Sequence, residues 1–367
     1  AGHKPVALVG GATGMVGDPS GKSAERNLLD ETTLAKNVAG IKAQLEKFLD
    51  FDTAKQNAAL MTNNYDWFKA ISFIDFLRDT GKHITVNYMM AKDSVKKRIE
   101  GDTGISYTEF AYQLMQGYDF YWLYNNLNCK LQFGGSDQWG NMTTGTELIR
   151  RKSGGEAFVF TCPLITKADG GKFGKTESGN IWLDANRTTP FQFYQFWLNA
   201  SDADASKWMK IFTFLNETTI NSLVTEHDAN PSARILQKAL AKEVTIFVHG
   251  IEEYNKAIET TEKLFANANA PAESLSVDDL ENMNGVQKIN FSRTIVDAGI
   301  DIVAFLADTT IFPSKGEAKK MVAGGGISIN RNKIDSLQFN VDSSLLLHNK
   351  YILAQKGKKN YYLIICN

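Results

Sequence analysis

The segment from Val6 to Ser23, VALVGGATGMVGDPSGKS, limits the fold more than any other part of the chain. A short apolar run ends at Val9, and repeated glycines follow it. Glycines after a buried strand let backbone amides approach a nucleotide at the carboxyl edge of a parallel sheet. The segment is not a P-loop, because Val16 stands where the GxxxxGK[ST] pattern requires glycine. Nucleotide binding and an ordinary tight turn between strand and helix are both open interpretations.

Strand-like and helix-like patterns alternate up to about residue 187, which predicts an α/β domain with a parallel sheet. Further strands are expected at Ala58–Thr62 and Lys130–Phe133, and a helix is expected over residues 34–48. Residues 188–285 carry few strand signals and predict a helical domain, with one long helix over Leu236–Tyr254. The polar stretch 270–285 marks its boundary with a third unit, residues 290–367.

The composition is that of a globular chain and excludes several classes of protein. Lys and Arg number 40 against 41 Asp and Glu over 367 residues, so no overall charge attracts nucleic acid. The cysteines, Cys129, Cys162 and Cys366, form no CxxC pair. Their spacing argues against a disulfide framework or a zinc site and favours the reducing cytoplasm. No apolar run approaches the roughly 20 residues of a membrane span, so no membrane partner is expected.

A helix that begins near Thr108, its expected N-cap, is too apolar for a surface position. From Thr108 to residue 126 the charged residues are Glu109 and Asp119. Tyr112, Gln116 and Asp119 are four and three residues apart and share one face of this helix. Because buried polar groups need partners, we expect this face to bind a small polar ligand such as an amino acid.

Two later segments combine glycines with polar side chains. In LQFGGSDQWGN (131–141) a strand and two glycines precede a helix that Ser136 or Asp137 is expected to cap. A functional alternative places Asp137 on a ribose hydroxyl, as acidic residues do at strand ends in nucleotide-binding folds. KADGGKFGKTESG (167–179) has the glycines and lysines of a loop that closes over phosphates. An exposed basic hairpin is the alternative for that loop.

The C-terminal region is basic. From Pro313 onward, nine Lys and Arg residues stand against three acidic residues. Ser314 and Glu317 have capping-box spacing before a short lysine-rich helix, which ends at three glycines and precedes a strand, Ile327–Asn330. A basic module on a neutral chain predicts contact with RNA, and a solvated lysine-rich face is the alternative.

Together these segments resemble one family, the bacterial tyrosyl-tRNA synthetases of class I. VGGATGMVGDPSGKSAER, the Tyr112-x₃-Gln116-x₂-Asp119 pattern, GGSDQWGN and KFGKT (172–176) occur in the family's order, and KFGKT is similar to its KMSKS loop. PSKGEAKKMVAGGGISIN resembles an S4-type RNA-binding domain. The resemblance implies a Rossmann-like catalytic domain at 1–187, a helical tRNA-binding and anticodon-binding domain at 188–285, and a small α+β S4-like RNA-binding domain at 290–367.

The resemblance also implies roles for residues at matching positions. Asp119 would accept the phenol hydroxyl of the substrate, and Tyr112, Gln116 and Asp18 would hold its α-ammonium group. Taken as a set, the implied tyrosine contacts are Thr13, Asp18, Tyr112, Gln116, Asp119, Gln132 and Gln138. The implied ATP contacts are Gly135, Asp137, Lys172 and Lys175, and the implied catalytic residues are Lys172, Lys175 and Thr176. The implied tRNA contacts are Lys315, Lys319, Lys320 and Arg331.

The implied reaction has two steps. The carboxylate of L-tyrosine attacks the α-phosphate of ATP to give tyrosyl-adenylate and pyrophosphate, and a terminal ribose hydroxyl of tRNA(Tyr) then takes the tyrosyl group. Mg²⁺ is expected with ATP, no metal site built from protein side chains is expected, and a homodimer through the catalytic domains is implied. The family's HIGH signature lies before the glycine-rich segment and is not among residues 1–367. We expect activity to depend on it.

Two other interpretations fit parts of the sequence. An NAD(P)-dependent short-chain dehydrogenase would account for the GxxGxxG pattern at Gly11, Gly14 and Gly17 and for Tyr65-x₃-Lys69, but it gives KFGKT no role. Pyrophosphate exchange into ATP would distinguish a synthetase from such an enzyme. A non-catalytic RNA-binding protein that keeps the S4-like region is the second interpretation.

Overall fold

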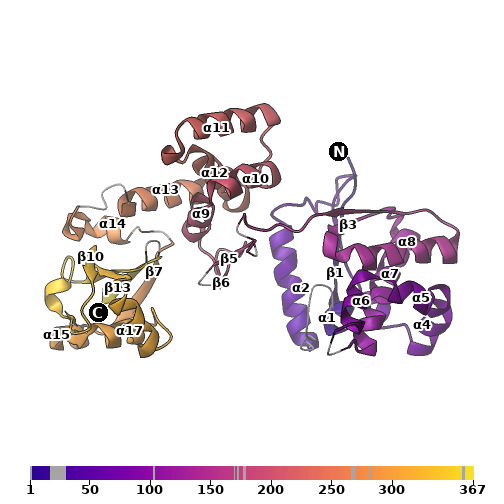
Figure 1. Cartoon of the computed structure of the whole chain (residues 1–367), viewed down its shortest axis with the longest axis horizontal. Coiled ribbons are helices and arrows are strands. Elements are labelled where there is room, and N and C mark those ends of the chain that lie inside the picture. Colours follow the sequence, from indigo (N-terminus) through magenta and orange to yellow (C-terminus); the bar gives the residue numbers. More distant parts are fainter. Residues whose placement is uncertain are drawn as a thin grey trace. The chain divides into compact units, whose positions relative to one another are not determined.

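The computed structural model describes residues 2–16, 30–101, 104–168, 170–171, 173–176, 179–265, 270–281, 283, 285–357 and 360–367. The chain divides into two compact units, Ala1–Thr166 and Lys167–Asn367 (Figure 1).

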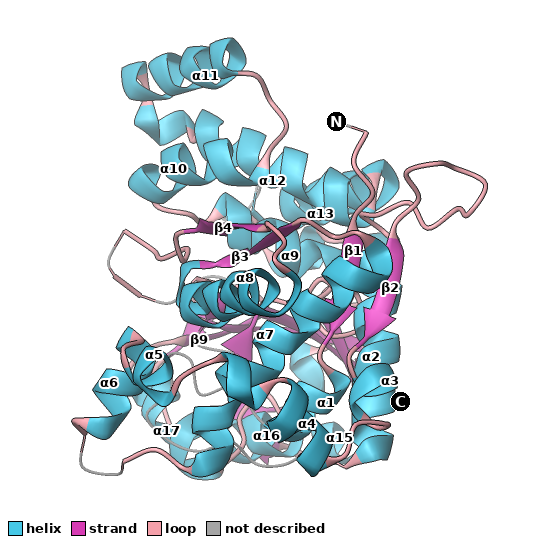
Figure 2. Cartoon of the chain, turned by 90° about the vertical axis from the view of Figure 1, so that its right-hand side faces the viewer, coloured by secondary structure: helices cyan, strands magenta, loops and turns pink. Residues whose placement is uncertain are grey.

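The first unit contains two parallel strand pairs, as expected for an α/β fold. Strand β1 (Val6–Val9) pairs with β2 (Leu60–Asn63), and β3 (Leu131–Gly135) pairs with β4 (Phe158–Cys162) (Figure 2). Because parallel strands need crossover connections, helices occupy the segments between them. These helices are α1 (Gly11–Val16), α2 (Glu31–Leu45), α3 (Tyr65–Phe68), α4 (Phe73–Asp79), α5 (Val86–Met90), α6 (Asp93–Ile99), α7 (Tyr107–Leu127) and α8 (Trp139–Ser153).

Helices α7 and α8 pack closely because glycine stands at their contact. A Cβ atom added at Gly145 would lie 2.8 Å from Cβ of Phe120, and one added at Gly117 would lie 3.0 Å from Cγ2 of Thr144. Phe120 and Leu148 are fully buried beside this contact. The close approach fixes the orientation of α7, the helix that carries the predicted polar face.

Two expected helix caps are wrong in detail. Ser106, and not Thr108, is the N-cap of α7, because Ser106 and Glu109 form a reciprocal capping box. Ser136 and Asp137 do not cap α8. They lie in a 3₁₀ turn, Ser136–Gln138, and Gln138 is the N-cap, without a side-chain hydrogen bond to the helix.

The second unit begins with a short hairpin and a group of helices. The hairpin pairs β5 (Lys175–Thr176) with β6 (Gly179–Asn180). The expected single helix over Leu236–Tyr254 is wrong, because Gly250 adopts φ +89° and divides it into two helices. The helices of this part are α9 (Pro190–Leu198), α10 (Asp202–Phe212), α11 (Glu217–Ala229), α12 (Ile235–His249), α13 (Ile251–Phe265) and α14 (Val277–Glu281).

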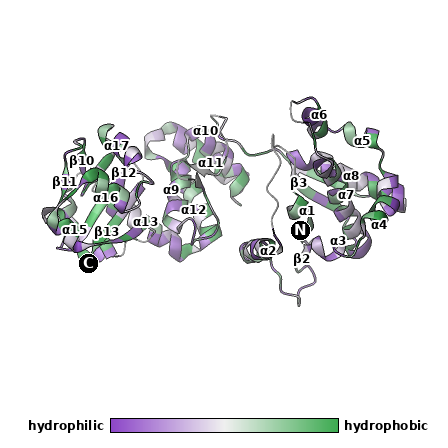
Figure 3. Ribbon diagram, turned by 90° about the horizontal axis from the view of Figure 1, so that it is seen from below, coloured by the Kyte–Doolittle hydropathy of each residue, from purple (hydrophilic) through white to green (hydrophobic). Residues whose placement is uncertain are grey.

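Residues 287–367 form a C-terminal module around a five-stranded sheet with the order β10-β9-β12-β13-β7. Only β13 and β7 pair in parallel among these strands. The apolar side chains concentrate on β13 and α16 (Figure 3), where Phe305 and Ile364 are fully buried. The elements of the module are β7 (Gln287–Phe291), α15 (Arg293–Ala298), β8 (Ile300–Asp301), α16 (Ile302–Asp308), α17 (Lys315–Ala323), β9 (Ile327–Ile329), β10 (Asn332–Ile334), β11 (Asn340–Val341), β12 (Tyr351–Lys356) and β13 (Asn360–Cys366).

Within the described ranges, no helix combines the length and the apolar character that crossing a bilayer would require.

Candidate functional site

Asp119 is the centre of a buried hydrogen-bond network in the first unit. It lies on α7 with 1% of its surface exposed. Its Oδ2 accepts a hydrogen bond from Nδ2 of Asn64 at 3.0 Å, and its Oδ1 accepts one from Nε1 of Trp67 at 3.0 Å. Trp67 is held in place by stacking on Trp122, with ring centroids 4.2 Å apart. The carboxyl group therefore has a fixed orientation.

The same network reaches the glycine-rich segment. Nδ2 of Asn64 also donates to Oγ1 of Thr13 at 2.9 Å, and the backbone amide of Ala12 donates to Oδ1 of Asn64 at 2.7 Å. Asn64 is fully buried and directly follows β2. Its side chain therefore connects α1 to α7 at the carboxyl end of that strand. The family resemblance places Thr13 and Asp119 in one tyrosine site, and the side-chain amide of Asn64 links the two residues.

Burial raises the pKa of the Asp119 carboxyl to about 7, although the hydrogen bonds from Asn64 and Trp67 act in the opposite direction. Each carboxylate oxygen has two lone pairs, and each accepts one of these two hydrogen bonds. Asp119 can therefore accept a further hydrogen bond from a ligand hydroxyl. Such a donor would favour the ionised form.

A second network connects Gln116 with the turn after β3. Nδ2 of Asn141 donates to Oε1 of Gln116 at 3.0 Å and to Oε1 of Gln138 at 3.3 Å. Nε2 of Gln138 donates to Oδ2 of Asp137 at 3.2 Å. Asn141, which was not predicted as a site residue, therefore links Gln116 to Gln138, and Gln138 in turn contacts Asp137.

The remaining predicted residues of the first unit lie on the same elements. Tyr112 is buried on α7, one turn before Gln116. Gln132 lies on β3, and its buried Oε1 has no hydrogen-bond partner among the described residues. A Cβ atom added at Gly135 would lie 2.6 Å from Oδ1 of Asp137, so a larger residue would displace that carboxylate. Asp18 lies outside the described residues.

The sequence analysis missed three residues that organise these networks, Asn64, Trp67 and Asn141. One signal for Asn64 was available, since the pair Asn63-Asn64 directly follows a predicted parallel strand, where ligand-binding side chains gather. Asn141 stands inside the GGSDQWGN motif. No motif or spacing in the sequence indicated a role for Trp67.

In the second unit, the loop that contains KFGKT is anchored by its aromatic residue. The ring of Phe173 lies 5.0 Å from that of Trp208 and 5.0 Å from that of Phe212, measured between centroids. The backbone amide of Ala168 donates to Oδ1 of Asp204 at 2.7 Å. Lys172 lies outside the described residues, and Lys175 and Thr176 are described only by their backbone, which pairs in the β5–β6 hairpin.

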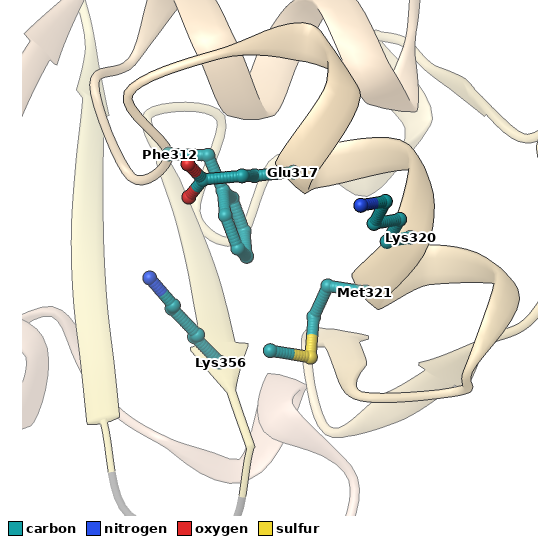
Figure 4. Close-up of a pocket in the computed structure, with 5 residues that line it drawn as sticks. All are labelled: Phe312, Glu317, Lys320, Met321 and Lys356. Atoms are coloured by element: carbon teal, nitrogen blue, oxygen red, sulfur yellow. The ribbon is translucent and has the colours of Figure 1, made fainter. Parts of the chain in front are cut away.

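The C-terminal module presents lysines on α17. Lys315, Lys319 and Lys320 are exposed. Lys320 also borders a hollow of about 320 Å³ that is lined by Phe312, Glu317, Lys320, Met321 and Lys356 (Figure 4). Nζ of Lys356 lies 4.1 Å from the ring centroid of Phe312. The hollow is therefore lined by two ammonium groups, one carboxylate and two apolar side chains.

Arg331 is placed differently from these lysines. Its guanidinium donates to the backbone carbonyls of Lys263 and Ala270, at 2.9 Å each. It is therefore held against the helical part of its own unit.

The side chains around Asp119 and Gln116 supply hydrogen-bond acceptors of two kinds. A fixed buried carboxylate can accept a hydrogen bond from a hydroxyl, and amide oxygens can accept hydrogen bonds from an ammonium group. The described residues contain no group of three or more His, Cys, Asp or Glu side chains placed to hold a metal ion.

Comparison with known proteins agrees with this chemistry. Residues 1–266 match the family of tRNA synthetases class I (W and Y), and residues 281–364 match the tyrosine–tRNA ligase SYY-like C-terminal domain. The tyrosine–tRNA ligase of Bacteroides fragilis is 58% identical over 369 residues, which cover 99% of this chain and 86% of that protein. That of Porphyromonas gingivalis is 60% identical over 371 residues, with 100% and 86% covered. The crystal structure of a C-terminally truncated mitochondrial tyrosyl-tRNA synthetase from Aspergillus nidulans superposes with a TM-score of 0.63 at 31% identity, covering 72% of this chain and 77% of that chain.

Proposed function

Because the chain belongs to the class I tyrosyl-tRNA synthetases, we propose that the networks around Asp119 and Gln116 hold its amino-acid substrate. The enzyme is a tyrosine–tRNA ligase, which activates L-tyrosine with ATP and transfers the tyrosyl group to tRNA(Tyr). The main observation that supports this site is the buried carboxyl of Asp119, which two donors fix and which can accept a third hydrogen bond. The phenol hydroxyl of tyrosine is a donor of the required kind.

The proposal includes the other tyrosine and ATP contacts that the family resemblance implies. Tyr112 and Gln116 hold the α-ammonium group of the substrate, together with Asp18, while Thr13, Gln132 and Gln138 line the amino-acid site. The unpartnered Oε1 of Gln132 supports this role, because a buried acceptor calls for a donor from the ligand. Gly135 and Asp137 face the ribose of ATP.

Catalysis in this reaction depends on positioning and on charge stabilisation. The substrate carboxylate attacks the α-phosphate, the bond to pyrophosphate breaks, and a ribose hydroxyl of tRNA later displaces AMP. Lys172, Lys175 and Thr176 stabilise the negative charge of the departing β- and γ-phosphates. Mg²⁺ enters with the phosphates of ATP, as part of the nucleotide substrate.

The C-terminal module binds tRNA through the exposed lysines of α17, Lys315, Lys319 and Lys320, in this proposal. A homodimer through the first unit is supported by large apolar side chains left exposed there, Phe73, Ile74, Val86 and Tyr107. The three free cysteines support a cytoplasmic location.

The substitution Lys175→Ala tests the catalytic part of the proposal. Adenylate formation should slow on the order of 100-fold, the range for removing one donor to a developing charge. The dissociation constant for tyrosine should hardly change, because this lysine acts on charge that appears in the transition state. Pre-steady-state kinetics on the full-length protein measure both quantities.

Lys238→Ala, on an exposed position of α12, is the matched control and should leave the adenylation rate unchanged. An adenylation rate of Lys175→Ala equal to that of the unmodified enzyme would contradict the assignment.

A further inference from the structure

We propose that Arg331 is a positioning residue, which fastens the C-terminal module to the end of helix α13 and so orients the lysines of α17 toward tRNA. This inference rests on the proposed RNA-binding role of the module. It concerns contacts inside the second unit, where α13 and α14 lie beside the C-terminal sheet (Figure 1).

The turn that carries Arg331 has a well-defined backbone conformation. Strands β9 and β10 pair with Asn332 opposite Ile329, so Asn330 and Arg331 form a two-residue turn. Both adopt positive φ, +48° and +69°, which residues other than glycine rarely do. Asn330 stabilises the turn, because its buried side chain donates to the carbonyl of Leu345 at 2.6 Å and accepts from the amide of Leu353 at 2.9 Å.

The guanidinium of Arg331 meets one carbonyl in the last turn of a helix and a second one beyond it. Lys263 lies in the last turn of α13, and Ala270 follows the helix in the chain. The last carbonyls of a helix have no partner inside it and carry the negative end of its dipole. Arg331 supplies both a charge of the opposite sign and two N–H donors, at 2.9 Å each. Its forked shape suits two separate acceptors better than a single ammonium does.

Neighbouring contacts join α13 to α14 and join the C-terminal module to residues 275–281. Nζ of Lys263 lies 2.8 Å from a carboxylate oxygen of Glu259 and 3.2 Å from one of Asp279, which ties α13 to α14. Nε2 of His348 lies 2.6 Å from the carbonyl of Leu275. The hydroxyl of Tyr351 donates to Glu281. Among these residues of the C-terminal module, Arg331 is the one that contacts α13, through the carbonyl of Lys263.

A basic residue can affect tRNA binding by contacting phosphate or by holding the module in place, and the two effects differ in their salt dependence. A lysine that touches phosphate releases counterions, so its loss lowers the salt dependence of binding. Both terminal nitrogens of Arg331 donate to backbone carbonyls of its own unit, so in this proposal Arg331 holds the module in place and does not bind phosphate. Its loss should therefore weaken binding by freeing the module, while the salt dependence stays the same.

The test compares tRNA(Tyr) binding by the full-length protein and its variants Arg331→Gln, Arg331→Lys and Lys319→Gln over a range of KCl concentrations. Arg331→Gln should weaken binding about tenfold at every salt concentration, with the slope of log K against log salt unchanged. Arg331→Lys should lose less, because one donor to a carbonyl survives. Lys319→Gln should reduce the slope by about one. Tyrosine-dependent pyrophosphate exchange should be the same in all variants, which shows that the part of the chain that activates tyrosine is intact in each.

Limited proteolysis gives a readout that does not involve RNA. Arg331→Gln should be cleaved faster than the unmodified protein within residues 270–281, and Lys319→Gln should not. A slope reduced by about one in Arg331→Gln would overturn the inference, because it would show direct phosphate contact. Unchanged affinity or an unchanged digestion pattern in that variant would overturn it as well. An unchanged slope in Lys319→Gln would contradict the proposed RNA face instead and would leave the digestion result to decide on Arg331.

Discussion

At the scale of single residues, Asp119 shows how burial and hydrogen bonding compete. Desolvation raises the pKa of its carboxyl, and the donors Asn64 and Trp67 only partly offset this effect. The buried carboxyl is therefore unfavourable in the free protein, and in the proposed site a bound phenol would lower this free energy by donating one more hydrogen bond. Selectivity for tyrosine would then depend on this one acceptor. A substrate without the hydroxyl would leave that acceptor buried and unpaired.

This balance predicts a pH dependence of stability. The ordinary pKa of the carboxyl is 3.8 and the folded-state pKa is about 7, so the folded state holds the proton more tightly. The free energy of unfolding should thus contain a contribution that is complete below about pH 4 and is lost as the pH rises to about 7, by at most about 1.4 kcal/mol per pH unit. Urea denaturation between pH 4 and 8 should give a flatter profile for Asp119→Asn than for the unmodified protein. Parallel profiles would contradict the burial of an ionisable group at this site.

At the scale of elements, the contact of α7 with α8 sets the geometry of the network around Gln116. Asp119 and Gln116 lie on α7, while Asn141 lies on α8, so a change in helix separation would shift Asn141 against Gln116. Glycine at positions 117 and 145 allows the close approach.

The helix contact predicts opposite effects for two glycine-to-alanine substitutions. Gly145→Ala should lower the free energy of unfolding by about 1–3 kcal/mol, because the new methyl group would overlap Phe120. Gly40→Ala is the control, since Gly40 lies in α2 with no atom within 4 Å of its added Cβ. That variant should be stabilised by about 0.5–1 kcal/mol. Equal effects of the two substitutions in thermal or urea unfolding would mean that the helices do not pack through position 145.

At the scale of the whole molecule, activation and tRNA binding are assigned to different parts of the chain. A protein that ends after α13 should keep tyrosine-dependent pyrophosphate exchange and lose aminoacylation of tRNA(Tyr), because it lacks the lysines of α17. Assays of both activities on the full-length and shortened proteins measure this separation. A shortened protein that charges tRNA normally would contradict the role of the C-terminal module.

Sequence reasoning succeeded where local pattern determines structure. The parallel α/β pairing, the buried polar face of α7 and the helix at Lys315–Ala323 all follow from periodicity and turn residues. It failed where a residue acts through a distant partner. Asn64 matters because of Asp119, 55 positions away, and Arg331 because of Lys263, 68 positions away. Such pairings depend on tertiary contacts, which spacing along the chain does not encode.

We propose above all that the Asp119 carboxyl accepts a hydrogen bond from the phenol hydroxyl of tyrosine. Calorimetric titration with tyrosine and phenylalanine tests this contact most directly. In the full-length protein, Asp119→Ala should weaken tyrosine binding by about 1.5–3 kcal/mol, the range for a hydrogen bond to a charged group, and phenylalanine binding much less. Asn126→Ala, at an exposed position of the same helix, should change neither. Equal losses for the two amino acids in Asp119→Ala would mean that this carboxyl supports the fold and does not recognise the hydroxyl.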